Sequence, residues 1–213
     1  MYFSQVKKTA LILSVIFLFC ISSAESQIFN LLGEKEKLSI PFVYDGQFIY
    51  VRMQINNGMY LNFILDSGAE NLLIIKKSIA DIHRLKYTKR IPIYGSDLKV
   101  MRYARISPMV EIDLGQEKTT FANFLVFEED ETSLDKYSGH RIDGIIGGAL
   151  LSKFIVHIDF DKSMLHLYKK KADIKDMNEF IPHDIEIIRK KPYITLEVED
   201  FNSTSEKTFL LDT

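Results

Sequence analysis

The sequence predicts an all-β protein with a closed or sandwiched arrangement of short strands. Apolar and polar residues alternate over short stretches, as in Val51 to Ile55, and a turn signal, Asn56-Asn57-Gly58, follows that stretch. Helical spacing is confined to one or two short segments. Many short strands with little helix favour a closed or sandwiched β architecture.

The composition is that of an ordinary globular protein. The chain has 213 residues, of which 46% are hydrophobic and 26% charged, which excludes a disordered, collagen-like or coiled-coil chain. The chain has 27 basic and 29 acidic residues, and no basic run stands out, so no nucleic-acid partner is expected. The single cysteine, Cys20, excludes a disulfide scaffold and a Cys-rich zinc site.

Residues 1–26 have the order of a secretory signal peptide. Two lysines precede an apolar run at 10–21, which is shorter than the roughly 20 residues of a membrane span, and small residues follow it. Cleavage after Ala24 or Ser26 fits this pattern. We therefore expect an exported protein (periplasmic, in the cell envelope or secreted) with no membrane span after cleavage; an uncleaved anchor is the alternative.

The remaining elements follow in order along the chain. Residues 63–65 form a short apolar run suited to a strand buried on both faces, and residues 72–86, with Ile75, Ile79 and Ile82, predict the first helix. An acidic surface loop is expected at 128–137 and one or two helical turns at 149–154. Further strands are predicted at 100–106, 109–112, 121–127 and 142–146, and a hairpin at 155–160 and 164–168.

One segment combines a strand with a candidate catalytic group. In Phe63-Ile64-Leu65-Asp66-Ser67-Gly68-Ala69 a carboxylate directly follows three apolar residues. We therefore expect Asp66 at the buried end of a strand, where the following turn directs its backbone N–H groups at the carboxylate. On its own, Asp-Ser-Gly is a common turn tripeptide. A second segment, Asp143-Gly144-Ile145-Ile146-Gly147, is a short apolar strand whose glycines indicate a close approach of backbone.

The C-terminal segment repeats the first motif. Ile194, Leu196 and Val198 alternate as residues 51–55 do, and Phe209-Leu210-Leu211-Asp212-Thr213 then matches residues 63–67. If the two carboxylates met, they would share one proton: one would act as general base on a water and the other would donate to the scissile carbonyl oxygen. The hydroxyls of Ser67 and Thr213 are expected to brace them.

These motifs, together with Val156-His157-Ile158-Asp159-Phe160-Asp161, resemble the retropepsin-like aspartic proteases, especially their secreted bacterial branch. The resemblance covers residues 40–168 and starts again at Pro192. It implies a closed β-barrel lobe with one or two short helices at 38–168, a linker at 169–191, and the truncated start of a second lobe at 192–213. It also implies peptide-bond hydrolysis without metal or other cofactor, with a polypeptide as the partner.

The resemblance assigns roles residue by residue. Asp66 is carried over as catalytic and Asp212 as its partner, with Ser67, Gly68, Ala69 and Thr213 in the active-site loops and Gly144, Ile146 and Gly147 supporting them. Because the chain stops within its second motif, we expect no completed site around Asp212. The second lobe would belong to the same chain at full length, or else a homodimer would supply the second aspartate.

Three departures from the family pattern concern this site. Ser67 stands where the family usually has Thr, and Glu70 adds a carboxylate where a small residue is common. Gly148 stands where viral relatives place the Arg that helps their dimer form, so a duplicated single chain fits better than a viral-style homodimer.

A flap that closes over substrate is expected at Tyr94-Gly95, because glycine permits a hairpin tip; an ordinary loop tip is the alternative. The five histidines show no H-E-x-x-H spacing, which argues against a zinc hydrolase. Two other readings stay open: a noncatalytic peptide-binding module of the cell envelope that uses the same lobe, and a structural envelope domain in which Asp66 belongs to a plain turn.

Overall fold

The computed structural model describes residues 35–94, 101–115, 120–131, 133–170, 174, 180–200 and 203–213. The predicted signal peptide and Gly95 lie outside these residues.

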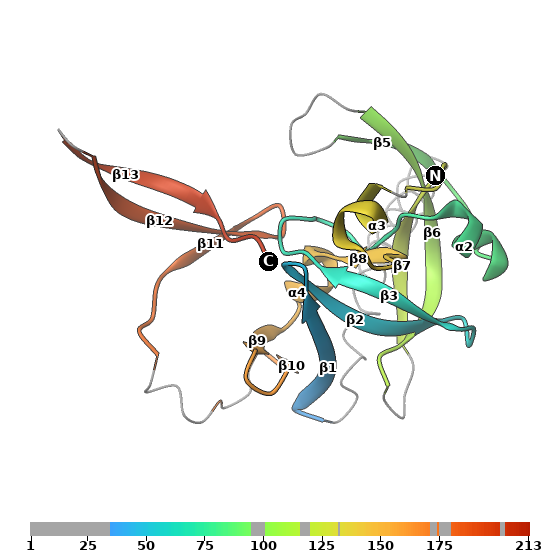
Figure 1. The fold of residues 1–213 in the computed structure, drawn as a ribbon, viewed down its shortest axis with the longest axis horizontal. Helices are drawn as coiled ribbons and strands as arrows, with labels where there is room; N and C mark the ends of the chain where they lie inside the picture. Colours follow the sequence, from blue (N-terminus) through green and yellow to red (C-terminus); the bar gives the residue numbers. More distant parts are fainter. Residues whose placement is uncertain are drawn as a thin grey trace, which may run out of the picture.

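The described part of the chain is mostly β, which confirms that prediction (Figure 1). The strands are β1 (Lys37–Asp45), β2 (Phe48–Ile55), β3 (Tyr60–Leu65), β4 (Leu73–Ile74), β5 (Arg90–Tyr94), β6 (Met101–Asp113), β7 (Thr120–Phe127), β8 (Gly144–Ile146), β9 (Ile155–Asp159), β10 (Met164–Tyr168), β11 (Ile185–Ile188), β12 (Lys191–Asp200) and β13 (Ser203–Leu210). The helices are short: α2 (Lys77–Ile82), α3 (Ser133–Ser138) and α4 (Gly148–Leu151).

The first ten strands form one sheet in the order β5-β6-β7-β4-β8-β3-β2-β1-β10-β9. An additional pairing of β6 with β2 closes the strands between them into a ring. Alternate side chains point into this ring because neighbouring residues of a strand face opposite sides. The fully buried residues of this core include Val51, Met53, Ile55, Leu61, Phe63, Leu72, Ile74, Ile112 and Phe124.

The prediction of a helix over 72–86 is wrong at both ends. Leu73 and Ile74 form β4, which pairs with β7 on one side and with β8 on the other. Pairing on both sides buries Ile74 completely, and this burial outweighs the local helical spacing. Only Lys77–Ile82 is helical, and Ile82 is 63% exposed, so it lies off the buried face.

Three further predictions need correction. The strands predicted at 100–106 and 109–112 are one strand, β6, interrupted by a bulge between Ser107 and Val110. The helix α3 begins within the predicted loop at 128–137 and ends one residue beyond it. The predicted linker at 169–191 contains β11. By contrast, the predicted hairpin is confirmed, since β9 and β10 pair antiparallel with Met164 opposite Asp159.

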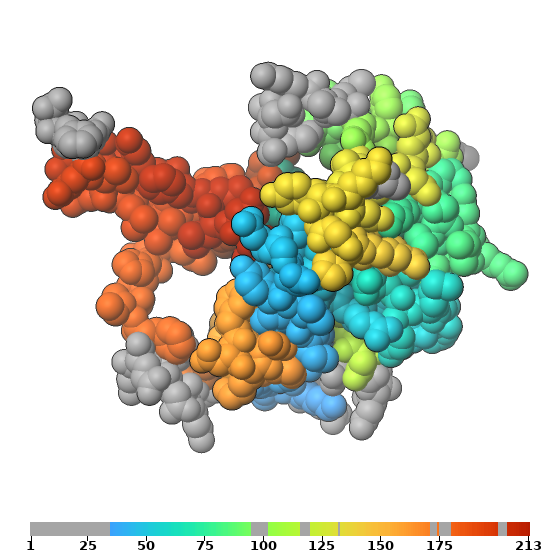
Figure 2. Space-filling model, viewed as in Figure 1, coloured from blue at the N-terminus to red at the C-terminus, as the bar shows by residue number. Residues whose placement is uncertain are grey.

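The last three strands form a separate sheet in the order β11-β12-β13, which stands to one side of the larger sheet (Figures 1 and 2). Its register repeats that of β1-β2-β3. Val51 pairs with Phe63 in the first sheet, and Ile194 pairs with Phe209 in the second; in both cases an aspartate follows the phenylalanine by three residues. Likewise Phe42 pairs with Val51, and Ile185 pairs with Ile194. The internal repeat therefore extends over three strands.

The two copies differ in what covers them. Met53, Phe63 and Leu65 are at most 1% exposed, whereas their counterparts Leu196, Phe209 and Leu211 are 40%, 43% and 40% exposed. The same apolar face is thus buried in the first copy and open in the second.

No helix among the described residues is both long enough and apolar enough to span a membrane.

Replacing Phe63 by Ala should lower the free energy of unfolding by about 3–5 kcal/mol, because it empties a fully buried ring position that contacts Phe124. Urea denaturation followed by circular dichroism measures this change. The matched control is Phe121→Ala in β7, where the side chain is 41% exposed and a much smaller loss is expected. Equal losses in the two variants would contradict the position of the core.

Candidate active site

Asp66 comes directly after β3, and its backbone is fixed by the neighbouring strand. The N–H of Asp66 donates to the carbonyl of Ile146, 3.0 Å away, which continues the parallel pairing of β3 with β8. The chain then turns, and the N–H of Ala69 donates to Asp66 Oδ1 at 2.9 Å. The carboxylate is therefore held in place by its own loop.

Glycines allow the segment after β8 to pack against this loop. A Cβ on Gly147 would lie 2.6 Å from the carbonyl oxygens of both Ala69 and Asn71, and the N–H of Gly148 donates to the carbonyl of Ala69 at 2.8 Å. A Cβ on Gly144 would overlap the ring of Phe63. The structure thus places Gly144, Ile146 and Gly147 against β3 or the Asp66 loop.

The end of the chain meets the Asp66 loop through crossed hydrogen bonds. The hydroxyl of Ser67 donates to the carbonyl of Leu211 at 2.6 Å, and the hydroxyl of Thr213 donates to the carbonyl of Leu65 at 3.3 Å. The N–H of Ser67 donates to Thr213 Oγ1 at 3.1 Å. Each hydroxyl therefore ties its own loop to the backbone of the other.

This crossing brings Asp212 to Asp66. The N–H of Gly68 donates to Asp212 Oδ1 at 3.2 Å, and Asp212 lies close enough to Asp66 to act on its carboxyl group. Burial and the neighbouring Asp212 carboxyl group together raise the pKa of Asp66 to about 6, with burial the larger cause. The N–H groups of Ala69 and Gly68 oppose this rise. Two carboxylates that share one proton can supply both a base and an acid.

Two details differ from the sequence-based expectations. Asp212 was expected to lack a completed site, yet it lies beside the Asp66 loop, because four hydrogen bonds connect residues 65–68 with 211–213. The hydroxyls of Ser67 and Thr213 were expected to brace the carboxylates; instead they donate to backbone carbonyls.

One ion pair beside the site was missed by the sequence analysis. Glu70 pairs with Arg189 Nη2 at 3.0 Å, and Arg189 lies in the turn between β11 and β12. The repeat contains the signal that points to this turn, because Ile188 to Lys191 corresponds in register to Asp45 to Phe48.

The expected flap is described only in part. Tyr94 ends β5 opposite Met101 of β6 and is 55% exposed, while Gly95 lies outside the described residues. The role of this hairpin as a flap stays a prediction.

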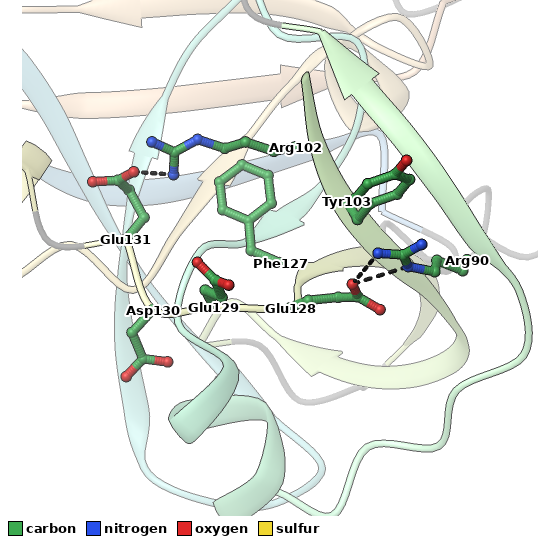
Figure 3. Close-up of a pocket in the computed structure, with 8 residues that line it drawn as sticks. All are labelled: Arg90, Arg102, Tyr103, Phe127, Glu128, Glu129, Asp130 and Glu131. Carbon is green, nitrogen blue, oxygen red and sulfur yellow. Dashed lines mark hydrogen bonds and ion pairs between the residues drawn. The ribbon is translucent and has the colours of Figure 1, made fainter. Parts of the chain in front are cut away.

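A cavity of about 440 Å³ lies between the β5–β6 hairpin and residues 127–131 (Figure 3). Its charges are largely paired: Arg90 bonds Glu128 at 2.9 Å, and Arg102 bonds Glu131. Neither Asp66 nor Asp212 lines it. Among the described residues, no group of three His, Cys, Asp or Glu side chains is placed to hold a metal ion.

Comparison with known proteins adds little to this geometry. No family model matches the chain, and no curated protein matches it. One of the solved structures that match is a crystal structure of a retropepsin-like aspartic protease from Rickettsia conorii. It is 20% identical, the match covers 62% of this chain and 90% of that chain, and the TM-score is 0.41. A likeness at this level decides neither the family nor the chemistry, which must come from the site itself.

The raised pKa of Asp66 predicts a pH-dependent stability. The folded protein holds the proton of Asp66 more tightly than the unfolded chain does, whose carboxyl has a pKa near 3.8. The contribution of this proton to the free energy of unfolding is therefore full below about pH 4 and is lost as pH rises through about 6. After allowance for solvent screening we expect a loss on the order of 2 kcal/mol.

Urea denaturation at half-unit steps from pH 3.5 to 7 gives the free energy of unfolding at each pH. The effect is the pH dependence of the difference in this free energy between the parent chain and Asp66→Asn. The exposed Asp184→Asn serves as control and should run parallel to the parent. If Asp66→Asn also ran parallel to the parent, the coupling of the two carboxyl groups would be refuted.

Proposed function

We propose that the protein is an aspartic endopeptidase that hydrolyses polypeptides with a water activated by Asp66 and Asp212. The observation that carries the proposal is the placement of two carboxyl groups, Asp66 and Asp212, beside each other at the ends of two repeated strands. An Asp-Ser-Gly turn alone would not need a second carboxylate 146 positions away, nor hydroxyls that tie the two loops together.

In the proposed reaction the pair holds one proton. The ionised carboxylate removes a proton from water, whose oxygen attacks the carbonyl carbon, while the protonated carboxyl donates to the carbonyl oxygen. The tetrahedral diol then collapses. Its C–N bond breaks, one proton passes by way of the carboxylates to the leaving nitrogen, and the pair returns to its singly protonated state. The pair serves as both base and acid, so the reaction draws on neither a metal nor a covalent intermediate.

We also propose that β11, β12 and β13 begin a second lobe. The exposed face that carries Leu196, Phe209 and Leu211 supports this, because the same face is buried in the first copy. An apolar face of this kind is normally covered by further structure. Membership of the secreted bacterial branch of the retropepsin-like proteases, and export by way of residues 1–26, belong to the same proposal and rest on the sequence motifs.

Asp66→Asn and Asp212→Asn should each lower the rate of cleavage of an unfolded polypeptide by at least about a hundredfold, because each removes one member of the acid–base pair. Cleavage of fluorescein-labelled casein by the full chain, between pH 3 and 8, measures this. Parent activity should fall above about pH 6, where the shared proton is lost, and a chelator should leave it unchanged.

The control for these substitutions is Asp184→Asn, which should keep parent activity. Cleavage that survives in Asp66→Asn would contradict the proposal. Absence of cleavage in the parent, together with peptide binding that persists in Asp66→Asn, would favour the noncatalytic binding module instead.

A further inference from the structure

The turn between β11 and β12 has an unusual composition for its conformation. Arg189 and Lys190 both have positive φ, 51° and 66°, in a two-residue hairpin turn. Such turns favour Asn-Gly or Gly-Gly, because side chains are disfavoured in the left-handed region. The corresponding turn of the first copy has Gly46 where the second has Arg189, with φ of 56°. An arginine at this position is therefore not explained by the turn itself.

Its contacts offer an explanation. Arg189 reaches across to Glu70, which lies four residues after Asp66 and one after Ala69. Beside this ion pair the backbone of the turn packs on Gly148, where an added Cβ would overlap the carbonyl oxygen of Lys190. The turn thus rests on Gly148, whose N–H donates to the carbonyl of Ala69 in the Asp66 loop.

We propose that Glu70 and Arg189 form a latch that holds the Asp212 loop against the Asp66 loop and selects the C-terminal sheet as the partner of the first lobe. The inference rests on the proposed function only in so far as these two loops carry the aspartate pair. Arg189 is a positioning residue, since it contacts neither carboxylate of the pair.

The two corresponding turns differ in charge, because the first copy has Gly46 where the second has Arg189. This difference makes the latch selective for the C-terminal sheet. If a second copy of the first lobe took the place of the C-terminal sheet, the residue facing Glu70 would be Gly46, which has no side chain to pair with it. Glu70 would then lose its cation. The charges therefore favour pairing of Asp66 with Asp212 over pairing of two Asp66 residues from separate chains.

Hydrogen exchange at the backbone N–H groups of Ser67 and Gly68 tests the latch without relying on catalysis, because both donate across the junction. Arg189→Gly is the informative variant. It gives the turn the residue that its positive φ favours, so the hairpin itself should not weaken, while the ion pair is lost. We expect exchange about two- to fivefold faster in Arg189→Gly and in Glu70→Gln, the range for a partly exposed ion pair.

The control is Lys190→Gly, which relieves the same kind of strain but keeps the latch, and should exchange as slowly as the parent. The double variant Glu70→Arg with Arg189→Glu, in which the two charges are swapped, should return the hydrogen-exchange rate to within twofold of the parent. Either charge reversal alone should give the fastest hydrogen exchange. Unchanged exchange in Arg189→Gly, equal acceleration in Lys190→Gly, or failure of the double variant to restore protection would each overturn the latch. This pattern of exchange in a protein that cleaves no peptide would uphold the latch and reject the peptidase.

Discussion

The site depends on the crossed hydrogen bonds between two loops that are 144 to 148 positions apart in the sequence. Two carboxylates repel each other when both are ionised, so Asp66 and Asp212 stay together only if other contacts hold them and a proton is shared. The hydroxyls of Ser67 and Thr213 provide these contacts by donating to backbone carbonyls. Backbone acceptors do not titrate, so these two hydrogen bonds do not themselves depend on the protonation state of the pair, whereas the repulsion between the carboxylates does.

The position of Asp66 in turn depends on how β3 is held. Within the strand the N–H of Asn62 donates to Asp143 Oδ2 at 3.0 Å, and directly after the strand the N–H of Asp66 donates to the carbonyl of Ile146. Asp143 is 1% exposed, and its charge is compensated by Arg141 at 2.7 Å and Lys76 at 3.8 Å. A buried carboxylate without such partners would be costly. The middle and the end of β3 are thus tied to the same short segment, residues 143–147, which also packs against the Asp66 loop.

The internal repeat shows how one pattern behaves in two settings. β1-β2-β3 and β11-β12-β13 share their pairing register, their two-residue turn and the aspartate that follows. In the first copy the apolar face lies inside a closed ring of strands, and in the second it is open. The two turns differ at their first residue, which has positive φ in both. Gly46 adopts this conformation without strain, whereas Arg189 adopts it with strain and pairs with Glu70.

The sequence by itself determined the mostly β fold, the β9–β10 hairpin and the repeated motif that ends in Asp66 and Asp212, because alternation and turn residues act locally. Tertiary structure decided the rest. Ile74 lies in a strand because β7 and β8 both offer hydrogen-bond partners, which helical spacing does not reveal. The approach of Asp212 to Gly68 and the pairing of Glu70 with Arg189 likewise join residues distant in sequence. Such contacts form only once the folded sheets set the distance between them.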